Sequence, residues 1–266
     1  MSTRWILTAQ DIKLPEVTRH IMIPDEIYDE IKRGDADRCV SLCNALMSDY
    51  EQVAGEEHSF MRTLQGHKFY MNFEEKDKAL KEINEDFMLH GTYEPNTTKL
   101  FESVIKEGMT CIDIGASIGY FTLLMARLVG ESGKVYAIEP TGNQFPVLKR
   151  NIEENGYNKR VEAVNFAAWD ESGFEVKIQT NKGEVGIMTG IKVDDIIPIG
   201  REVDFIKIDT DGSEPHVLKG LLGTIEKNPQ LQMVIEYYPA YIKNMGGDPQ
   251  EVLDILNKYF TLEKIA

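Results

Sequence analysis

Residues 110–121 run Thr-Cys-Ile-Asp-Ile-Gly-Ala-Ser-Ile-Gly-Tyr-Phe, and this stretch decides the fold. In its first half, Cys111, Ile112 and Ile114 place apolar side chains on both faces, which is typical of a strand inside a parallel sheet. Gly115 and Gly119 then let the backbone turn and approach another group closely. An apolar run at helical spacing follows as far as Leu128. A strand, a glycine turn and the N-terminus of a helix together predict a site for a nucleotide-type cofactor.

The side chains around this turn indicate which cofactor it binds. Dinucleotide sites use Gly-x-Gly-x-x-Gly, but here Ser117 stands in place of the second glycine, where the pyrophosphate would lie. Asp113 precedes the turn, and a carboxylate there repels phosphate and attracts an ammonium group. Glu139 ends the next predicted strand and can accept hydrogen bonds from both hydroxyls of a ribose. An ammonium group and a ribose without a pyrophosphate predict S-adenosylmethionine.

A simpler alternative is a parallel-sheet domain in which Asp113 and Glu139 only cap neighbouring helices. Two acids at the ends of successive strands, with a glycine turn between them, favour a cofactor site over that alternative. The site then includes Asp113, Gly115, Ser117, Gly119 and Glu139.

Two further segments are expected to line the cofactor. Asn165 and Ala167 belong to the third predicted strand, 161–169, and by position they lie along the adenine ring. The turn 91–98 precedes the first strand and is expected near the methionine end. Its candidate ligands for the methionine carboxylate or ammonium are Glu94, Thr97 and Thr98. Simple capping of the following helix by Asn96 or Thr97 is an equal alternative.

Four segments resemble, in order, those of the FkbM-type methyltransferases. They are Asp113-Ile-Gly-Ala-Ser-Ile-Gly-Tyr-Phe-Thr122, Val135-Tyr-Ala-Ile-Glu-Pro140, Leu148-Lys-Arg-Asn-Ile-Glu-Glu-Asn-Gly156 and Val203-Asp-Phe-Ile-Lys-Ile-Asp-Thr-Asp-Gly-Ser-Glu214. In the last segment Asp211 takes the place usually held by Glu. The resemblance runs from about Gly91 to the C-terminus. It implies a class I, S-adenosylmethionine-dependent fold and usually O-methylation of a hydroxyl on a sugar, polyketide or similar small molecule. Acceptors vary within the family, so the resemblance does not name the acceptor.

The pattern of elements predicts an α/β architecture for residues 89–266, with a mostly parallel, Rossmann-like sheet and helices on both faces. Residues 1–88 are predicted to form a mainly helical N-terminal extension, in which 66–73 is a strand or hairpin arm. Segments 174–180 and 191–197 suggest an inserted hairpin, 249–259 a helix, and 262–265 a last strand. No seventh, antiparallel strand is found after the last predicted one. Either the sequence stops short of it, or the inserted arm or the N-terminal unit completes the sheet edge, and we expect that edge to be covered.

Candidate catalytic groups follow the fourth and fifth predicted strands. A hydroxyl acceptor needs a base during methyl transfer, and Asp209 and Glu236 end the strands that flank the expected methyl position. His90, close in sequence to the expected lid, is a second candidate. Asp209, Asp211 and Glu236 could also hold a divalent metal such as Mg²⁺. Capping of the next helix by Asp211 and Glu214 is the favoured interpretation, so no metal site is predicted.

Composition limits the partners and the setting. The net charge of −15 and the lack of a Lys/Arg cluster exclude nucleic acid and an anionic membrane surface as expected partners. A small neutral or cationic acceptor fits better. No apolar run is long enough to span a bilayer, the N-terminus lacks a signal-peptide pattern, and the three cysteines form no zinc or disulfide pattern. We therefore expect a cytoplasmic protein.

The sequence thus predicts an S-adenosylmethionine-dependent methyltransferase that O-methylates a small molecule. The alternatives are an N-methyltransferase of a small amine and a non-catalytic module that only binds the cofactor. An NAD-dependent oxidoreductase is the weakest alternative, because the dinucleotide glycines are missing. The oligomeric state does not follow from the sequence.

Overall fold

A computed structural model describes residues 50–52, 59–64, 66–72, 92–179 and 185–265 of the chain. The chain divides into two compact units, Met1–Glu94 and Pro95–Ala266. In the first unit, β1 (Tyr50–Gln52), β2 (Ser59–Leu64) and β3 (His67–Asn72) form an antiparallel sheet in that order. Strand β3 confirms the strand predicted at 66–73. The predicted helices of this unit, and His90, lie outside the described residues.

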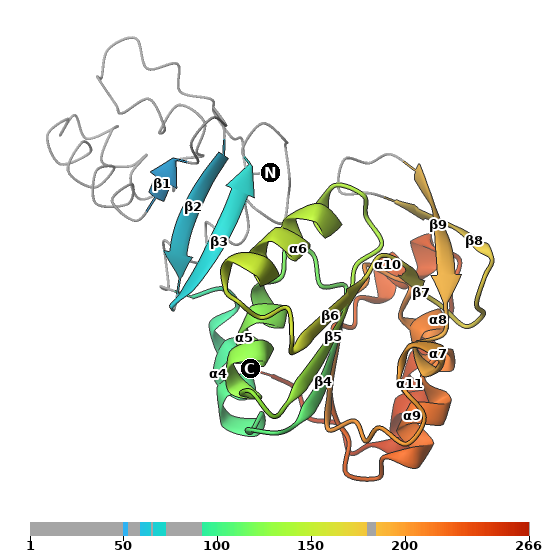
Figure 1. The fold of residues 1–266 in the computed structure, drawn as a ribbon. Helices are drawn as coiled ribbons and strands as arrows, with labels where there is room; N and C mark the ends of the chain where they lie inside the picture. Colours follow the sequence, from blue (N-terminus) through green and yellow to red (C-terminus); the bar gives the residue numbers. More distant parts are fainter. Residues whose placement is uncertain (1–49, 53–58, 65, 73–91, 180–184, 266) are drawn as a thin grey trace, which may run out of the picture. The chain divides into compact units, whose positions relative to one another are not determined.

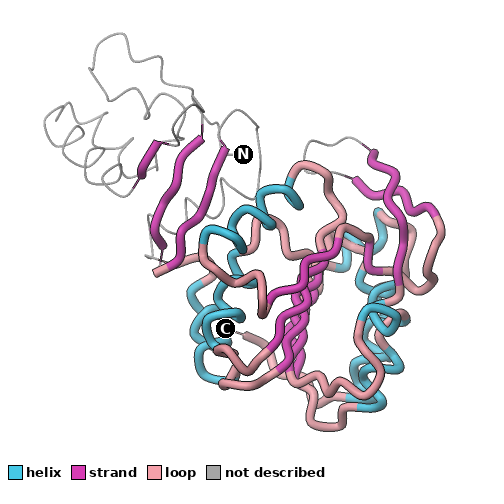
Figure 2. The backbone as a smooth tube through the Cα atoms, in the orientation of Figure 1, coloured by secondary structure: helices cyan, strands magenta, loops and turns pink. Residues whose placement is uncertain are grey.

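The second unit is built on a five-stranded sheet. Its strands are β4 (Thr110–Ile114), β5 (Lys134–Ile138), β6 (Val161–Val164), β10 (Phe205–Ile208) and β11 (Gln232–Ile235). They lie in the order β11-β10-β4-β5-β6, and every neighbouring pair is parallel. Figure 2 shows this sheet in magenta between two groups of cyan helices. The strand order reverses between β4 and β10, which is where ligands bind in open α/β sheets. The predicted parallel sheet is confirmed.

Helices cover both faces of this sheet (Figure 1). One side carries α4 (Pro95–Val104), α5 (Tyr120–Leu128) and α6 (Gln144–Glu154). The other carries α7 (Val193–Ile196), α8 (Glu214–Lys219), α9 (Leu222–Lys227), α10 (Pro239–Asn244) and α11 (Pro249–Tyr259). Helix α11 has the bounds that the sequence predicted. Its start is fixed by Asp248, whose side chain accepts a hydrogen bond from the N–H of Gln250 (2.9 Å).

Alternation along the strands sends different side chains to the two faces. Ile112, Ile114 and their counterparts on β5 and β10 join a buried apolar cluster with residues of α7, α8, α9, α10 and α11. On the opposite face, the ring of Phe101 packs against those of Phe121 and Phe205, with centroid distances of 4.9 and 4.8 Å. That second face also carries the polar side chains of the site.

The inserted arm differs from the prediction. The third strand is not continuous over 161–169, because β7 (Ala167–Ala168) leaves the main sheet and pairs with β9 (Val185–Ile191). Strand β8 (Glu175–Gln179) completes a separate sheet in the order β7-β9-β8. The arm prediction was right for β8, but the second strand precedes the predicted segment, and 193–196 is helical. This arm extends neither edge of the five-stranded sheet.

The predicted last strand at 262–265 was wrong. Residues 260–265 have no strand pairing in the part of the chain that the structure describes. An apolar alternation becomes a strand only when a neighbouring edge supplies hydrogen bonds, and no described strand pairs with this segment.

Asp194 holds the segment that follows the arm against the core. Its carboxylate accepts hydrogen bonds from the N–H of Gly223 (2.8 Å) and from the N–H and hydroxyl of Thr224 (2.7 Å each). It therefore caps α9 from a distance in sequence. Asp195 instead accepts a hydrogen bond from the exposed Ser172 hydroxyl.

Asp194→Ala is expected to lower the free energy of unfolding by about 1–2 kcal/mol, because the first turn of α9 loses its cap. Asp195→Ala is the matched control and should cost less than about 0.5 kcal/mol, as exposed surface changes do. Urea denaturation followed by circular dichroism measures both. Equal losses in the two variants would contradict a capping role for Asp194.

Candidate active site

The polar residues of the candidate site lie just beyond the carboxyl ends of four neighbouring strands. Glu236 follows β11, Asp209 follows β10, Gly115 follows β4 and Glu139 follows β5. Their backbone N–H groups extend the sheet by one more row. These hydrogen bonds run from Glu236 to Ile208 O (2.9 Å), Asp209 to Ile114 O (3.0 Å), Gly115 to Ile138 O (3.0 Å) and Glu139 to Val164 O (3.1 Å). The prediction that acids gather at this edge is therefore confirmed for Asp209, Glu236 and Glu139.

The glycine turn is packed tightly against its neighbours. Gly115 has a φ of +80°, and a Cβ on it would lie 1.8 Å from the backbone carbonyl oxygen of Asp209. Gly119 has a φ of +100°, and a Cβ there would lie 2.7 Å from Leu148 Cδ1 on α6. Packing against backbone thus requires a glycine at position 115, whereas at position 119 the left-handed φ is the stronger constraint, because the Leu148 side chain can shift. The sequence had suggested only that the backbone approaches some other group closely at these positions.

Glu139 ties the glycine turn to the end of β5. It is 3% exposed, and its two oxygens accept hydrogen bonds from the Ser117 N–H (2.8 Å), the Thr141 N–H (2.8 Å) and the Thr141 hydroxyl (2.5 Å). Burial raises the pKa of Glu139, and these hydrogen bonds oppose the rise. Ser117 has a φ of +52°, and its buried hydroxyl has no partner among the described residues.

Asp113 lies below the turn and is fully buried. Its Oδ2 accepts a hydrogen bond from the Thr122 hydroxyl of α5 (2.5 Å), while Oδ1 is buried without a partner among the described residues. Burial raises the pKa of Asp113, and the positive charge of Lys207 opposes the rise. An unpartnered oxygen on a buried carboxylate is costly, which marks the position as one that a ligand or a water can complete.

Lys207 is a site residue that the sequence reasoning missed. It lies in the middle of β10 with its Cα directly opposite that of Asp113, and it is 4% exposed. Its Nζ is 2.9 Å from Asp209 Oδ2 and 5.0 Å from the centre of the Phe121 ring. The signal was present in the sequence, because a lysine in an otherwise apolar strand must find a buried partner.

The acids that follow β10 and β11 have different surroundings. Glu214 is 2% exposed, and its Oε1 accepts hydrogen bonds from the N–H and hydroxyl of Thr210 and from the Gly212 N–H. It therefore holds the turn that enters α8. Glu236 is exposed, yet partial desolvation and the nearby Asp209 raise its pKa to about 7. No cluster of metal-ligating side chains occurs among the residues that the structure describes.

The other residues that the sequence predicted to bind the cofactor, Asn165, Ala167 and Thr97, belong to three different segments of the chain. Asn165 donates from Nδ2 to the carbonyl oxygens of Glu139 (2.8 Å) and Pro140 (3.0 Å), so it fixes the loop after β5. Ala167 is buried in β7. Thr97 is partly exposed on α4, whereas the adjacent Thr98 bonds the Tyr120 hydroxyl at the start of α5 (3.0 Å).

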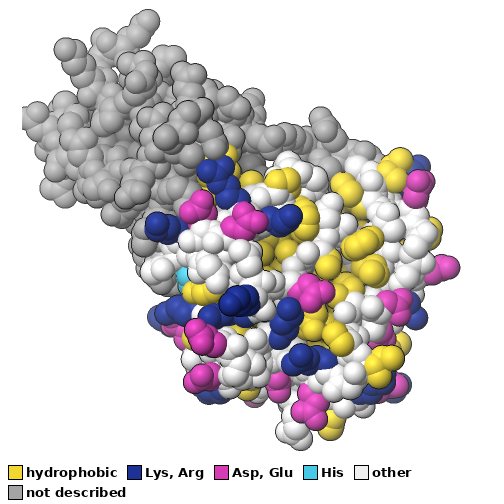
Figure 3. All heavy atoms as spheres, in the orientation of Figure 1, with side chains coloured by type: hydrophobic (Ala, Val, Ile, Leu, Met, Phe, Trp, Pro, Cys, Tyr) yellow, Lys and Arg dark blue, Asp and Glu magenta, His cyan; other side chains and the backbone are white. Residues whose placement is uncertain are grey.

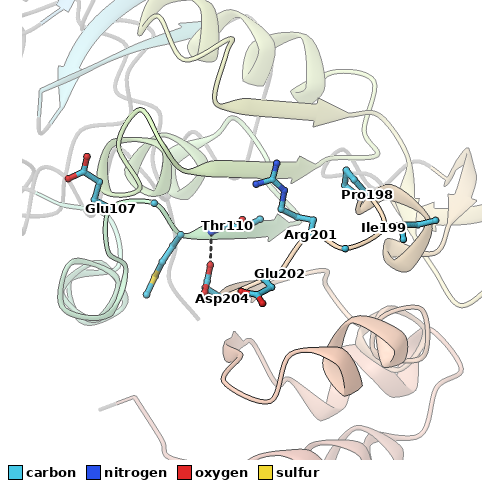
Figure 4. A pocket seen from close by; sticks show the side chains of 10 residues that line it. Glu107, Thr110, Pro198, Ile199, Arg201, Glu202 and Asp204 are labelled. Carbon is cyan, nitrogen blue, oxygen red and sulfur yellow. Dashed lines mark hydrogen bonds between the residues drawn. The ribbon is translucent and has the colours of Figure 1, made fainter.

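A hollow of about 740 Å³ lies at the opposite, amino ends of the strands (Figure 4). Its walls are residues 107–110 and residues of the segment 198–204, and Asp204 accepts a hydrogen bond there from the Thr110 N–H (2.8 Å). It is therefore separate from the row of acids. Figure 3 shows one face of this unit, on which acidic side chains lie among basic ones and hydrophobic side chains are exposed near the middle.

This chain is similar to curated proteins over a part of its length. The curated protein-L-isoaspartate O-methyltransferase of Methanococcoides burtonii is 43% identical over 54 residues, which are 20% of this chain and 27% of that protein. The enzyme of the same name from Thermotoga maritima is 35% identical over 66 residues, 25% of this chain and 20% of that one. The chain thus spans about a quarter of the length of the curated relatives it matches.

Solved structures with a similar arrangement include an FkbM methyltransferase from Methylobacillus flagellatus. It is 19% identical, with 68% of this chain and 47% of that chain covered and a TM-score of 0.43. A S-adenosylmethionine-dependent methyltransferase from Aquifex aeolicus is 24% identical, with 62% and 78% covered and a TM-score of 0.37.

The family model described as "Methyltransferase FkbM domain" matches residues 113–260, from within β4 to just beyond α11. The match includes Asp113, Glu139, Lys207, Asp209 and Glu236, and the fold is the class I, Rossmann-like fold that the resemblance implied. Because this model covers more than half of the 266 residues, the chain belongs to the FkbM methyltransferase family.

Proposed function

We propose that this FkbM-family methyltransferase transfers the methyl group of S-adenosylmethionine to a hydroxyl group of a small molecule. The observation that carries the proposal is the single row of Glu139, Gly115, Asp209 and Glu236 along the carboxyl edge of the sheet. Glu139 and Gly115, at one end of the row, suit the nucleoside of the cofactor. Asp209 and Glu236, at the other end, are carboxyl groups that can accept or donate a proton.

The residues around the glycine turn fit the cofactor that the family implies. The buried Oδ1 of Asp113 and the Ser117 hydroxyl have no partner among the described residues, and both suit the polar groups of the amino-acid moiety. Glu139 would hold the ribose hydroxyls, and Asn165 fixes the loop beside it. The cofactor supplies an electrophilic methyl group on a sulfonium when it is bound.

The acids Asp209 and Glu236 favour a hydroxyl acceptor over an amine. A hydroxyl must lose its proton as the new bond forms, and a carboxylate at this end of the row can accept it. An amine needs only to arrive neutral. The negative charge of this edge also attracts a cationic amine. N-methylation is therefore the alternative that an experiment has to distinguish from O-methylation.

The overall charge supports a small molecule as the acceptor. A net charge of −15 opposes docking on phosphate-rich partners, so neither a nucleic acid nor an anionic membrane is part of the proposal. The described residues include no helix with the length and apolar character of a membrane span.

Calorimetric titration tests the cofactor. S-adenosylhomocysteine is expected to bind and NAD is not, because Ser117 and Asp113 oppose a pyrophosphate. Mg²⁺ is expected to leave the affinity unchanged. Binding of NAD alone would overturn the assignment of the glycine turn.

Transfer of isotope-labelled methyl from S-adenosylmethionine then tests the acceptor class, with one panel of small hydroxyl compounds and one of small amines. Label in the hydroxyl panel supports O-methylation. Label confined to the amine panel would replace it with N-methylation.

A further inference from the structure

The two carboxyl groups at the acceptor end of the row do not have equivalent surroundings. Lys207 Nζ lies 2.9 Å from Asp209 Oδ2, and the side chains of Lys207 and Asp209 are 6% and 32% exposed. Among the described residues, no cation makes an ion pair with Glu236. We propose that Lys207 is a positioning residue that makes this pair asymmetric: it keeps Asp209 ionised and leaves the proton of the pair on Glu236.

The position of Lys207 is fixed from several sides. Strand β10 is buried along its whole length, and the Cα of Lys207 pairs with that of Asp113 on β4. Paired residues of adjacent strands point to the same face of a sheet, and so do residues two apart in one strand. The side chain of Lys207 therefore lies between the buried Asp113 on β4 and Asp209, which follows β10. The Phe121 ring of α5 covers the ammonium group at 5.0 Å from its centroid. These contacts hold the ammonium group beside Asp209.

Asp209 and Glu236 directly follow Ile208 and Ile235, which are paired residues of the adjacent strands β10 and β11, so the two carboxyl groups lie at neighbouring positions on one face of the sheet. Neighbouring carboxyl groups disfavour double ionisation and titrate as a pair. The ammonium of Lys207 favours the charged form of Asp209. Glu236 faces negative groups instead. Within the described part of the chain, the charged groups that face this pair include Lys207, Asp113, Asp211 and Glu214. Partial desolvation and the charge of Asp209 raise the pKa of Glu236 to about 7, which agrees with a proton held on Glu236.

The asymmetry assigns different roles to the two acids in the reaction; this step rests on the proposed function. Asp209 takes the proton of the acceptor hydroxyl while the oxygen forms its bond to the methyl carbon. The carbon–sulfur bond breaks at the same time, and its electron pair stays on sulfur, so the leaving thioether is neutral. Glu236, in its protonated form, donates a hydrogen bond that holds the Asp209 carboxylate in place. Lys207 acts through Asp209 and touches neither substrate.

The first test measures which acid carries the proton. Carbon-13 NMR titration of the carboxyl carbons in the whole protein, with Asp209→Asn and Glu236→Gln to assign the signals, needs no acceptor. A signal that titrates near pH 7 is expected in the wild type and is expected to be lost in Glu236→Gln. In Asp209→Asn, the midpoint of Glu236 should fall by more than about one pH unit, because the repelling charge is removed. A signal near pH 7 that survives in Glu236→Gln would overturn the proposal.

The second test measures what Lys207 does. Lys207→Met is expected to raise the midpoint of Asp209 by about one pH unit or more, whereas Lys207→Arg, which keeps the charge, leaves it nearly unchanged. If Lys207→Met does not fold, Lys207→Met combined with Asp113→Asn removes the uncompensated buried carboxylate as well and gives the same comparison. An unchanged Asp209 midpoint in the folded variant without the lysine would overturn the proposal. Calorimetric titration of the wild type with S-adenosylhomocysteine tests the proposed function independently of the NMR titrations. If S-adenosylhomocysteine does not bind, the proposed function is wrong, and the NMR midpoints alone decide whether Lys207 makes the two acids unequal.

Discussion

Gly115→Ala is expected to lower the free energy of unfolding by about 3 kcal/mol or more, a large share of the roughly 5–15 kcal/mol that keeps a domain folded. Two costs combine. A left-handed φ of +80° disfavours any residue with a Cβ, by about 1–2 kcal/mol. The added Cβ would also lie 1.8 Å from the Asp209 carbonyl oxygen, and backbone at a strand end cannot give way as a flexible side chain can.

Two other glycines separate these costs. Gly156 has a φ of +69° with no atom within 4 Å of a built Cβ, so Gly156→Ala should show only the conformational cost of about 1 kcal/mol. Gly142 has neither a left-handed φ nor a close neighbour, and Gly142→Ala should be near neutral. Urea denaturation of the three variants gives the order. If Gly115→Ala is no less stable than Gly156→Ala, the clash with Asp209 has no energetic weight.

Glu139→Gln is expected to weaken the binding of S-adenosylhomocysteine by about tenfold to a hundredfold. A hydrogen bond to a charged group contributes about 1.5–3 kcal/mol, and 1.4 kcal/mol corresponds to a factor of ten in affinity. The amide nitrogen of glutamine cannot accept a hydrogen bond. It would therefore face either the Ser117 N–H or the N–H and hydroxyl of Thr141, all of which now donate to Glu139. The ribose would lose an acceptor, and the glycine turn would lose its tie to β5.

Calorimetric titration of Glu139→Gln measures this loss, and a thermal melt shows whether the fold survives. Glu162→Gln is the matched control, because Glu162 lies on β6 with a half-exposed side chain that pairs with Lys134 on the surface (3.3 Å). Its affinity should equal that of the wild type. A folded Glu139→Gln variant with unreduced affinity would remove Glu139 from the cofactor site.

The sequence predicted those parts of the fold that depend on local signals. A strand was expected before Gly115 because Cys111, Ile112 and Ile114 are apolar on both faces, and the structure has it as 110–114. Helix 249–259 was placed to the residue. The break after Val164 was not predictable, because Ala167 and Ala168 continue the apolar pattern of β6. Only the position of β9 shows that these alanines leave the main sheet. Strand partners are a tertiary property that alternation alone does not encode.

The candidate site was predictable to a similar extent. Asp209 and Glu236 could be placed together because the carboxyl ends of parallel strands meet at one edge of the sheet. Lys207 escaped notice because a lysine is usually a surface residue, and only the register of β10 against β4 reveals that it faces Asp113. The tight packing of Gly115 on Asp209 was also out of reach, since the contact joins residues almost a hundred positions apart.

The contact between Gly115 and the carbonyl of Asp209 has a consequence for motion during turnover. The Asp209 N–H bonds Ile114 O (3.0 Å), and the N–H groups of Gly115 and Ala116 bond Ile138 O (3.0 Å each). The glycine turn and the end of β10 are thus fastened to one frame and have to move as a rigid body. A close-packed frame of this kind keeps the distance from the cofactor turn to Asp209 constant from one catalytic cycle to the next. Acceptors of different size must then be accommodated by the segments that surround this frame, which can vary in sequence without disturbing the alignment inside it.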